Sequence, residues 1–325
     1  MKSLILVFCF VLSTCYAVTL KVGVLAPEGS TWGKSLKGMA KEISEKTQGK
    51  VKLKIYYGGV AGDEPDVLRK IRIGQMHGGV FTGRALGDIN GDVRSIEIPF
   101  SFHTDRVKAW KTLKSAEPFF NKGFEKNKFV NLAFFEIGLV YIVSTKKVSN
   151  LEELKKVKIW SWEGDDLVSD LVKSMKLVSV PLPLPDVLTS LTTGLIESAY
   201  SSPLGMLALQ WNTKIKYIVD FPVSFSIGAF LVHQKQWKKV PAKYKSIVQE
   251  LAKKHIDLAN AKTVKENEEA IEIMKSSGVK VVKFPESDIK KGREVRSTVV
   301  KNLTGKLFSK KALEKAEAFL DWKKK

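Results

Sequence analysis

The chain has 325 residues, and 54 Lys and Arg against 34 Asp and Glu give it a formal net charge of +20 at pH 7. A chain of this length is longer than one typical hydrophobic core accommodates, so we predict two lobes. Such a charge can indicate nucleic acid or anionic membrane as a partner, but only seven of the basic residues are arginine and the lysines are interleaved with acidic residues. We therefore exclude nucleic acid and interpret the charge as a lysine-rich solvated surface, with attraction to anionic lipid or an acidic partner left open.

The N-terminal segment has the layout of a secretory signal peptide. Lys2 supplies a positive charge, residues 4–12 form an almost unbroken apolar run, and small residues precede Ala17. The run is too short to anchor the mature protein across a bilayer. We predict that residues 1–17 are a signal peptide removed after Ala17. Lipoprotein processing at Cys15 is the alternative, disfavoured because the residue before the cysteine is atypical of a lipobox.

The sequence lacks the residue patterns that mark common enzyme active sites. Both cysteines, Cys9 and Cys15, lie inside the predicted signal, so the mature chain has no disulfide, thiolate nucleophile or cysteine metal site. The four histidines are far apart, without metal-ligand spacing. No phosphate-binding loop, nucleophile elbow or dinucleotide glycine motif is present. We therefore expect no enzymatic activity, no cofactor and no metal site.

Strands and helices alternate along the mature chain, which predicts α/β lobes with largely buried sheets. Ser30 or Thr31 can cap the first helix, whose apolar positions recur with a helical period, and Gln48-Gly49 ends it. The predicted strands are 19–25, 51–57, 78–82, 129–135, 139–144, 157–160, 196–200, 225–232 and 279–284. The other predicted helices are 65–73, 104–125, 165–175, 186–191, 242–276 and two near the C-terminus. No low-complexity linker is present, so strands crossing between the lobes should join them.

Several short motifs occur in an order and spacing that are specific when taken together. They are Lys21-Val22-Gly23, Thr47-Gln48-Gly49, Tyr57-Gly58-Gly59, Arg72-Ile73-Gly74, Ile98-Pro99-Phe100-Ser101-Phe102, Lys158-Ile159, Leu191-Thr192-Thr193-Gly194-Leu195-Ile196-Glu197, and Trp237 with Val240-Pro241-Ala242. On these motifs, most of the mature chain resembles the solute-binding (P, or DctP-type) subunit of tripartite ATP-independent periplasmic (TRAP) transporters.

The resemblance implies a periplasmic protein of two α/β lobes with a ligand cleft between them, a long helix spanning both, and hinge closure over a solute. We expect residues 18–142 plus 225–260 to form lobe I and residues 143–224 plus 261–325 to form lobe II. The implied partners are a small-molecule ligand and the TRAP membrane permease, which an ion gradient drives.

The chain departs from the family at its substrate clamp. Most members carry an arginine at the position of Trp160, where the guanidinium fork matches a ligand carboxylate. Indole offers one N–H donor and an apolar face instead. Where many relatives carry glycine-phenylalanine-arginine, this chain has Gly138-Leu139-Val140. It therefore resembles a subset that has an aromatic residue at the clamp, is paired with a periplasmic tetratricopeptide-repeat protein and is suspected of taking hydrophobic ligands.

We interpret Trp160 as the principal ligand contact and Tyr200, at the end of a predicted strand, as the second. Because Trp160 and Trp162 alternate on one strand, we expect that both cannot line the same wall. Core packing is the alternative for every aromatic candidate, and a surface salt bridge is the alternative for Arg84, a possible relocated clamp. The full set of candidate ligand-binding residues is Trp160, Tyr200, Phe81, Phe100, Tyr141, Trp211, Phe225 and Arg84.

The sequence thus predicts a receptor for a hydrophobic or amphipathic solute. Two alternatives stay open. One is an ordinary organic-acid receptor with a relocated cationic clamp, and the other is a periplasmic scaffold or carrier that never supplies a permease.

Overall fold

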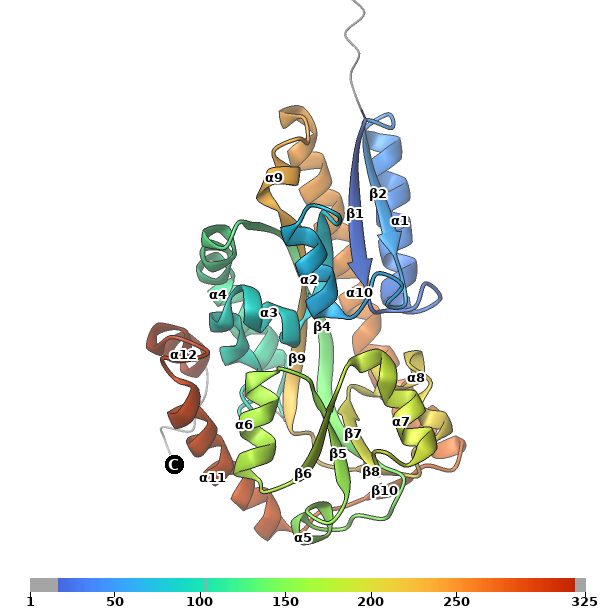
Figure 1. The fold of residues 1–325 in the computed structure, drawn as a ribbon, viewed down its shortest axis with the longest axis vertical. Coiled ribbons are helices and arrows are strands. Elements are labelled where there is room, and N and C mark those ends of the chain that lie inside the picture. The colour runs from blue at the N-terminus through green and yellow to red at the C-terminus, as the bar shows by residue number, and fades with distance from the viewer. Residues whose placement is uncertain (1–16, 103, 319–325) are drawn as a thin grey trace, which may run out of the picture.

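The computed structural model describes residues 17–102 and 104–318 (Figure 1). The predicted signal peptide, with Cys9 and Cys15, lies outside the described residues except for the exposed Ala17. No helix within 17–102 and 104–318 is both long enough and apolar enough to cross a membrane.

Among the described residues, one mixed sheet of ten strands organises the fold (Figure 1). Its main path runs β2-β1-β3-β9-β4-β7-β5-β6, and β8 pairs with β4 and β10 beside it. The strands are β1 (Val18–Val24), β2 (Val51–Tyr56), β3 (Gly78–Thr82), β4 (Phe129–Ser144), β5 (Lys158–Trp162), β6 (Val178–Leu182), β7 (Ser198–Ser201), β8 (Tyr217–Val219), β9 (Ser224–His233) and β10 (Lys280–Val282).

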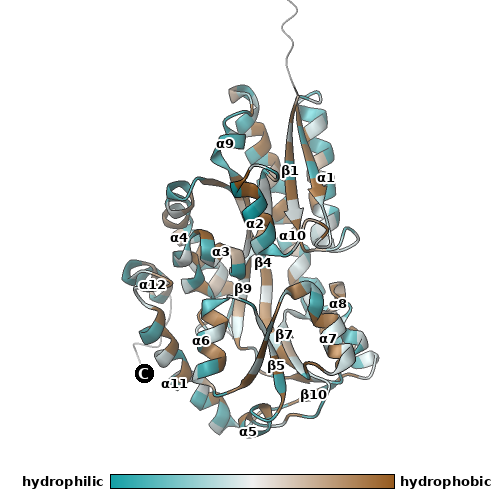
Figure 2. Ribbon diagram, viewed as in Figure 1, coloured by the Kyte–Doolittle hydropathy of each residue, from teal (hydrophilic) through white to brown (hydrophobic). Residues whose placement is uncertain are grey.

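Helices cover the sheet, and their polar faces are turned outward while the strands are largely hydrophobic (Figure 2). Within 17–102 and 104–318, the 3-10 helices are η1 (Gly91–Glu97), η2 (Leu184–Asp186) and η3 (Trp211–Thr213). The α-helices are α1 (Thr31–Lys46), α2 (Glu64–Arg72), α3 (Gly83–Ile89), α4 (Arg106–Lys126), α5 (Leu151–Leu154), α6 (Asp166–Ser174), α7 (Val187–Thr193), α8 (Pro203–Ala208), α9 (Gln234–Trp237), α10 (Ala242–Ser276), α11 (Glu286–Leu303) and α12 (Lys310–Glu317).

The molecule has two ends joined by long elements (Figure 1). We call β1–β3 with α1–α4 and η1 the first lobe, and β5–β8 and β10 with α5–α8 the second lobe. Strand β4 connects them, because Phe129–Val140 pairs with β9 and Tyr141–Ser144 with β7. Helix α10 packs on α1 at one end and on α8 at the other, while α11 packs on α6 and α12 on α4. The predicted α/β fold with a long helix spanning both lobes is confirmed.

Several predicted boundaries differ from the structure. The strands predicted at 129–135 and 139–144 are one strand, β4, whose pairing with β9 shifts register at Asn131/Ala133 and Glu136/Gly138. Of the two caps predicted for the first helix, Ser30 is the one that the structure uses, and its hydroxyl accepts a hydrogen bond from Gly33 N. Bulges keep β4 continuous through residues that interrupt its apolar pattern.

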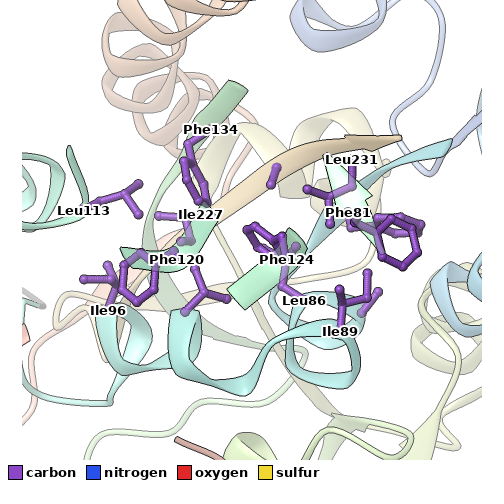
Figure 3. Packing of buried hydrophobic residues seen from close by; sticks show 14 of the residues in the cluster. Phe81, Leu86, Ile89, Ile96, Leu113, Phe120, Phe124, Phe134, Ile227 and Leu231 are labelled. Atoms are coloured by element: carbon purple, nitrogen blue, oxygen red, sulfur yellow. The ribbon is translucent and has the colours of Figure 1, made fainter. Parts of the chain in front are cut away.

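The largest core cluster lies under α3 and α4 in the first lobe (Figure 3). Phe81 on β3, Phe124 on α4 and Phe134 on β4 are all buried in it. A second cluster lies on the other face of the sheet between α1 and α10 and includes Leu20, Met39 and Phe230. These cores hold the ends of β1 and β3 in place.

Gly138 stands at the crossing between the lobes and has φ +117°, a conformation that side chains rarely adopt. A Cβ atom there would lie 2.7 Å from Asn267 Nδ2. Asn267 donates to Ile137 O at 3.0 Å and accepts from Leu204 N at 3.0 Å, so it connects α10, β4 and α8. We expect Gly138→Ala to lower the free energy of unfolding by about 2–3 kcal/mol in urea titrations.

Gly58 provides the matched control for this glycine. It also has positive φ, +61°, but a Cβ atom there would meet no atom within 4 Å. Gly58→Ala should therefore cost only the backbone strain, about 1 kcal/mol. Equal losses of unfolding free energy in the two variants would show that the Asn267 contacts contribute nothing to stability.

Candidate functional site

A cavity of about 210 Å³ lies between the two lobes. The first lobe contributes the carboxyl ends of β1 and β3 and the first turns of α1 to α3, and the second lobe contributes β5 and α6. The crossing strand β4 forms the floor. The apolar lining side chains include Val24, Leu25, Trp32, Val80, Ile137, Val140, Ile142, Trp160, Trp162, Leu167, Leu171, Val172, Met175, Leu177, Leu184, Leu209 and Val223. Most of the lining is thus aliphatic or aromatic.

Trp160 is held in a cluster of aromatic rings at the end of β5. It is only 1% exposed and its ring stacks on Tyr200 at 4.7 Å between centroids, with Trp211 edge-on at 5.7 Å. The indole Nε1 donates to Leu182 O at 2.9 Å. Because the single donor of this side chain is already used, Trp160 offers the cavity only apolar surface.

Trp162 lines the same cavity and corrects the expectation from the sequence. Its ring centroid lies 5.7 Å from that of Trp160, and both residues belong to the lining. The prediction that both could not line one wall is wrong, because residues two apart on a strand project to the same face. Trp162 N also donates to the Tyr200 hydroxyl at 3.2 Å, and burial raises the pKa of that hydroxyl.

Arg84, the candidate relocated clamp, lines the cavity but has partners. Its Nη1 lies 2.7 Å from Asp88 Oδ2, and its Nε donates to Glu163 O at 2.7 Å. The second contact joins α3 of the first lobe to the turn after β5. The guanidinium therefore already serves a contact between the lobes.

A buried ion-pair network forms another part of the lining. Arg94 Nη1 lies 2.9 Å from Glu97 Oε2, and Arg94 Nη2 donates to Asp165 at 2.9 and 3.0 Å. Burial opposes the charge of Arg94, but Asp165 and Glu97 outweigh it and raise its pKa. Asp165 also caps α6 by accepting from Leu167 N and Val168 N. None of these three residues was among the sequence candidates.

Glu64 is a second unpredicted carboxyl group in the lining. It is 2% exposed, and its oxygens accept from Thr82 N at 2.7 Å and Ala85 N at 3.1 Å. Burial raises its pKa to about 8, against the opposing effect of these N–H groups. The carboxyl is therefore largely protonated and neutral at pH 7.

The remaining candidates lie outside the cavity lining. Phe81 and Phe225 are buried in the core of the first lobe, and Figure 3 shows Phe81 there. Tyr141 packs in the core of the second lobe, and Trp211 supports Trp160 from behind. Phe100 stacks on Phe221 at 5.9 Å. The structure therefore brings Trp160, Tyr200 and Arg84 together at the cavity.

Another contact across the lobes joins Trp162 and Asp63, whose Oδ2 accepts from Trp162 Nε1 at 2.9 Å. Burial raises the pKa of Asp63, and the indole donor opposes this. Trp162→Phe removes the hydrogen bond while keeping an aromatic ring. We expect it to shift the protein towards an open form, seen as a larger radius of gyration in small-angle X-ray scattering.

Trp110→Phe is a suitable control for this variant, because Trp110 packs on the first-lobe core and does not line the cavity. Its scattering curve should match that of the wild type. An unchanged curve for Trp162→Phe as well would show that this hydrogen bond does not hold the lobes together.

Two α/β lobes that enclose a cavity, joined by crossing strands and one long helix, define an extracytoplasmic solute-binding protein. The family described as bacterial extracellular solute-binding protein, family 7 (DctP) matches residues 22–307. The chain belongs to this family, the periplasmic solute receptors of TRAP transporters.

Curated relatives are distant in sequence. A solute-binding protein of Chromohalobacter salexigens is 30% identical over 169 residues, which are 51% of this chain and 50% of that relative. The match thus spans half the length of that protein. A solute-binding protein of Verminephrobacter eiseniae is 21% identical over 304 residues, 91% of this chain and 88% of the relative.

Solved structures share the fold at low sequence identity. The sugar acid binding protein DctPAm of Advenella mimigardefordensis, in complex with galactonate, has a TM-score of 0.86 at 17% identity and covers 94% of this chain and 98% of its own. The Bordetella pertussis receptor DctP7, which binds pyroglutamic acid, has a TM-score of 0.85 at 18% identity, with coverages of 93% and 99%. A TRAP periplasmic solute binding protein of Desulfovibrio salexigens, with bound orotic acid, has a TM-score of 0.82 at 19% identity, with coverages of 93% and 98%.

Proposed function

We propose that this receptor closes over a small hydrophobic or amphipathic molecule and delivers it to a TRAP membrane permease. The observation that carries the proposal is the lining of the cavity, which is aliphatic and aromatic on both lobes. Ligand pockets of this composition gain affinity mainly from apolar burial, and a few polar groups orient the ligand. Trp160 and Tyr200 are the aromatic contacts that we propose for the ligand.

The charges around the cavity support the same ligand class. Within the described part of the lining, the cationic side chains are Arg84 and Arg94. Arg84 is paired with Asp88, and Arg94 is paired with two carboxylates. A ligand carboxylate at either guanidinium would lie close to carboxylates that already neutralise its charge, which is unfavourable in a buried site.

Native mass spectrometry of the mature protein purified from its own periplasm, followed by organic extraction, tests the proposal. We expect a lipid-like or other hydrophobic molecule to co-purify. A co-purifying acidic metabolite would refute the apolar assignment. Repeated recovery of empty protein, with no hydrophobic molecule bound in direct titrations, would favour a periplasmic scaffold.

An organic-acid receptor is the second candidate, because the solved structures cited above hold galactonate, pyroglutamic acid and orotic acid. Trp160→Arg separates the two. If only the clamp has been lost, the new arginine should confer binding of these acids in calorimetric titrations. We expect no gain, because a guanidinium at position 160 would face a remodelled apolar wall beside Tyr200 and Trp211.

Other parts of the assignment are proposals supported by single observations. The proposed lobes remain 18–142 plus 225–260 and 143–224 plus 261–325, and the switch of β4 from β9 to β7 after Val140 supports the boundary near residue 142. The missing clamp supports membership of the subset that is paired with a tetratricopeptide-repeat protein. Export by the signal peptide 1–17, or anchoring through Cys15, is proposed from the sequence pattern alone.

A further inference from the structure

A second, smaller cavity lies beside the cavity between the lobes, which we call the main cavity. The smaller cavity, which we call the annex, has a volume of about 20 Å³, against about 210 Å³ for the main cavity. Ile142 on β4, Met175 at the end of α6 and Val223 before β9 line both cavities. One layer of side chains therefore separates the annex from the main cavity.

The annex is apolar on almost every side. Its other lining side chains come mainly from α5, α11 and the segments that precede α4, α11 and β9, and they include Phe100, Leu151, Leu154, Phe221, Phe284 and Val295. Asp288 also lines the annex, but its carboxylate accepts from Leu151 N at 2.8 Å and lies 3.3 Å from Lys291 Nζ. Because a buried water needs two to four polar partners, a cavity of this size and lining suits one small apolar group, about the size of a methyl.

Phe100 forms its part of the annex wall in a strained backbone conformation. Its φ is +59°, in the left-handed region that bulky side chains rarely adopt. Phe100 N donates to Val223 O at 2.8 Å, and the ring lies so close to α11 that a Cβ atom at Gly292 would be 3.0 Å from it. The preceding residue, Pro99, lines the main cavity. The chain thus holds a strained residue where it passes from the wall of one cavity to the wall of the other, and such strain is concentrated at ligand sites.

Met175 is the shared residue that can move most easily. Its side chain is unbranched and has three rotatable bonds, whereas Ile142 and Val223 are branched at Cβ and are restricted in their first torsion angle. A rotation of the Met175 side chain would join the two cavities without a change in the backbone. The gap that it leaves has the width of one alkyl chain.

We propose that the annex receives the end of the ligand's apolar chain and that Met175, in the partition between the cavities, sets how long that chain can be. The inference rests on the apolar ligand proposed above and narrows it to molecules with a flexible, unbranched alkyl chain. Rigid ring systems do not fit the annex, because they are wider than the gap that one methionine side chain leaves.

Isothermal titration calorimetry of the ligand-stripped mature protein with straight-chain alcohols, from butan-1-ol to decan-1-ol, tests this. We expect the affinity to rise about fourfold with each added methylene and to level off at the length that fills both cavities. Met175→Ala opens the partition and should extend the rise by about two methylenes, because the side-chain atoms beyond Cβ leave room for them. Val295→Phe fills the annex from α11, outside the lining of the main cavity, and should end the rise at a shorter chain.

Two matched variants control for side effects. Met39→Ala and Val300→Phe make the same substitutions at residues that line neither cavity, so their affinities should level off at the wild-type chain length. If the wild type, Met175→Ala and Val295→Phe all level off at one length, or if none of them levels off, the annex has no part in binding and the apolar receptor still stands. Failure of every alcohol to bind would overturn the proposed function as well.

Discussion

We expect Arg94→Met to lower the free energy of unfolding by about 3–5 kcal/mol, the effect of breaking a buried ion pair from one side. The side chains of Arg94, Glu97 and Asp165 are only 5–6% exposed, and the guanidinium contacts both carboxyl groups at 2.9 Å. Methionine fills similar space but leaves two buried carboxyl groups without their cation. Urea unfolding followed by tryptophan fluorescence measures the loss.

Arg69→Met is the matched control, because Arg69 pairs with Asp66 at 2.8 Å on the surface, with side chains 68% and 47% exposed. Exposed pairs contribute about 0–1 kcal/mol, so this variant should unfold close to the wild type. Similar losses in the two variants would contradict our assignment of the Arg94 network as a buried structural element.

Neutralising the stranded carboxyl groups should restore part of the loss. In Arg94→Met with Glu97→Gln and Asp165→Asn, the amide oxygens can still accept from Ile227 N and from the first turn of α6. No buried charge then lacks a partner, so the triple variant should be more stable than Arg94→Met alone. The network joins the two lobes. If the lobes unfold in separate steps in either variant, we expect this in Arg94→Met rather than in the triple variant.

Much of the fold follows from local signals. Helix α10 has the predicted bounds, since Pro241 precedes it and Gly278 follows it closely. Strand β3 also has its predicted bounds. Strands β6 and β8 were not predicted. β8 has only three residues, and β6 is an edge strand containing Pro181, which interrupts a strand pattern.

The site was predicted less completely because its polar part depends on contacts between distant segments. Trp160 was found because it replaces an expected arginine, and Tyr200 because it ends a strand. Arg94 and Asp165 are 71 positions apart, and no local pattern joins them. Glu64 is the first residue of α2, where a carboxylate ordinarily faces solvent and interacts favourably with the helix dipole. Only the approach of β3 and α3 buries it.

The same burial of Glu64 leads to the second prediction, a loss of stability as the pH rises. The pKa of Glu64 is about 8 in the folded protein, against 4.5 as its ordinary value. The folded state therefore holds a proton that the unfolded state has released between these values. Its contribution is fully present below about pH 4.5 and is lost as the pH rises towards 8, by up to about 4 kcal/mol. Burial also raises the pKa of Glu97, which acts in the same direction.

Glu64→Gln isolates the contribution of one carboxyl group. Glutamine cannot ionise, so the variant lacks the pH-dependent contribution of Glu64. Its unfolding free energy, measured in urea at each pH, should therefore fall less steeply between pH 5 and pH 8 than that of the wild type. The variant should be less stable than the wild type at pH 5, because one amide oxygen must replace two acceptors for Thr82 N and Ala85 N. The two curves should approach each other as the pH rises. Glu28→Gln, at an exposed side chain, should run parallel to the wild type, and parallel curves for Glu64→Gln as well would mean that Glu64 is ionised in the folded protein.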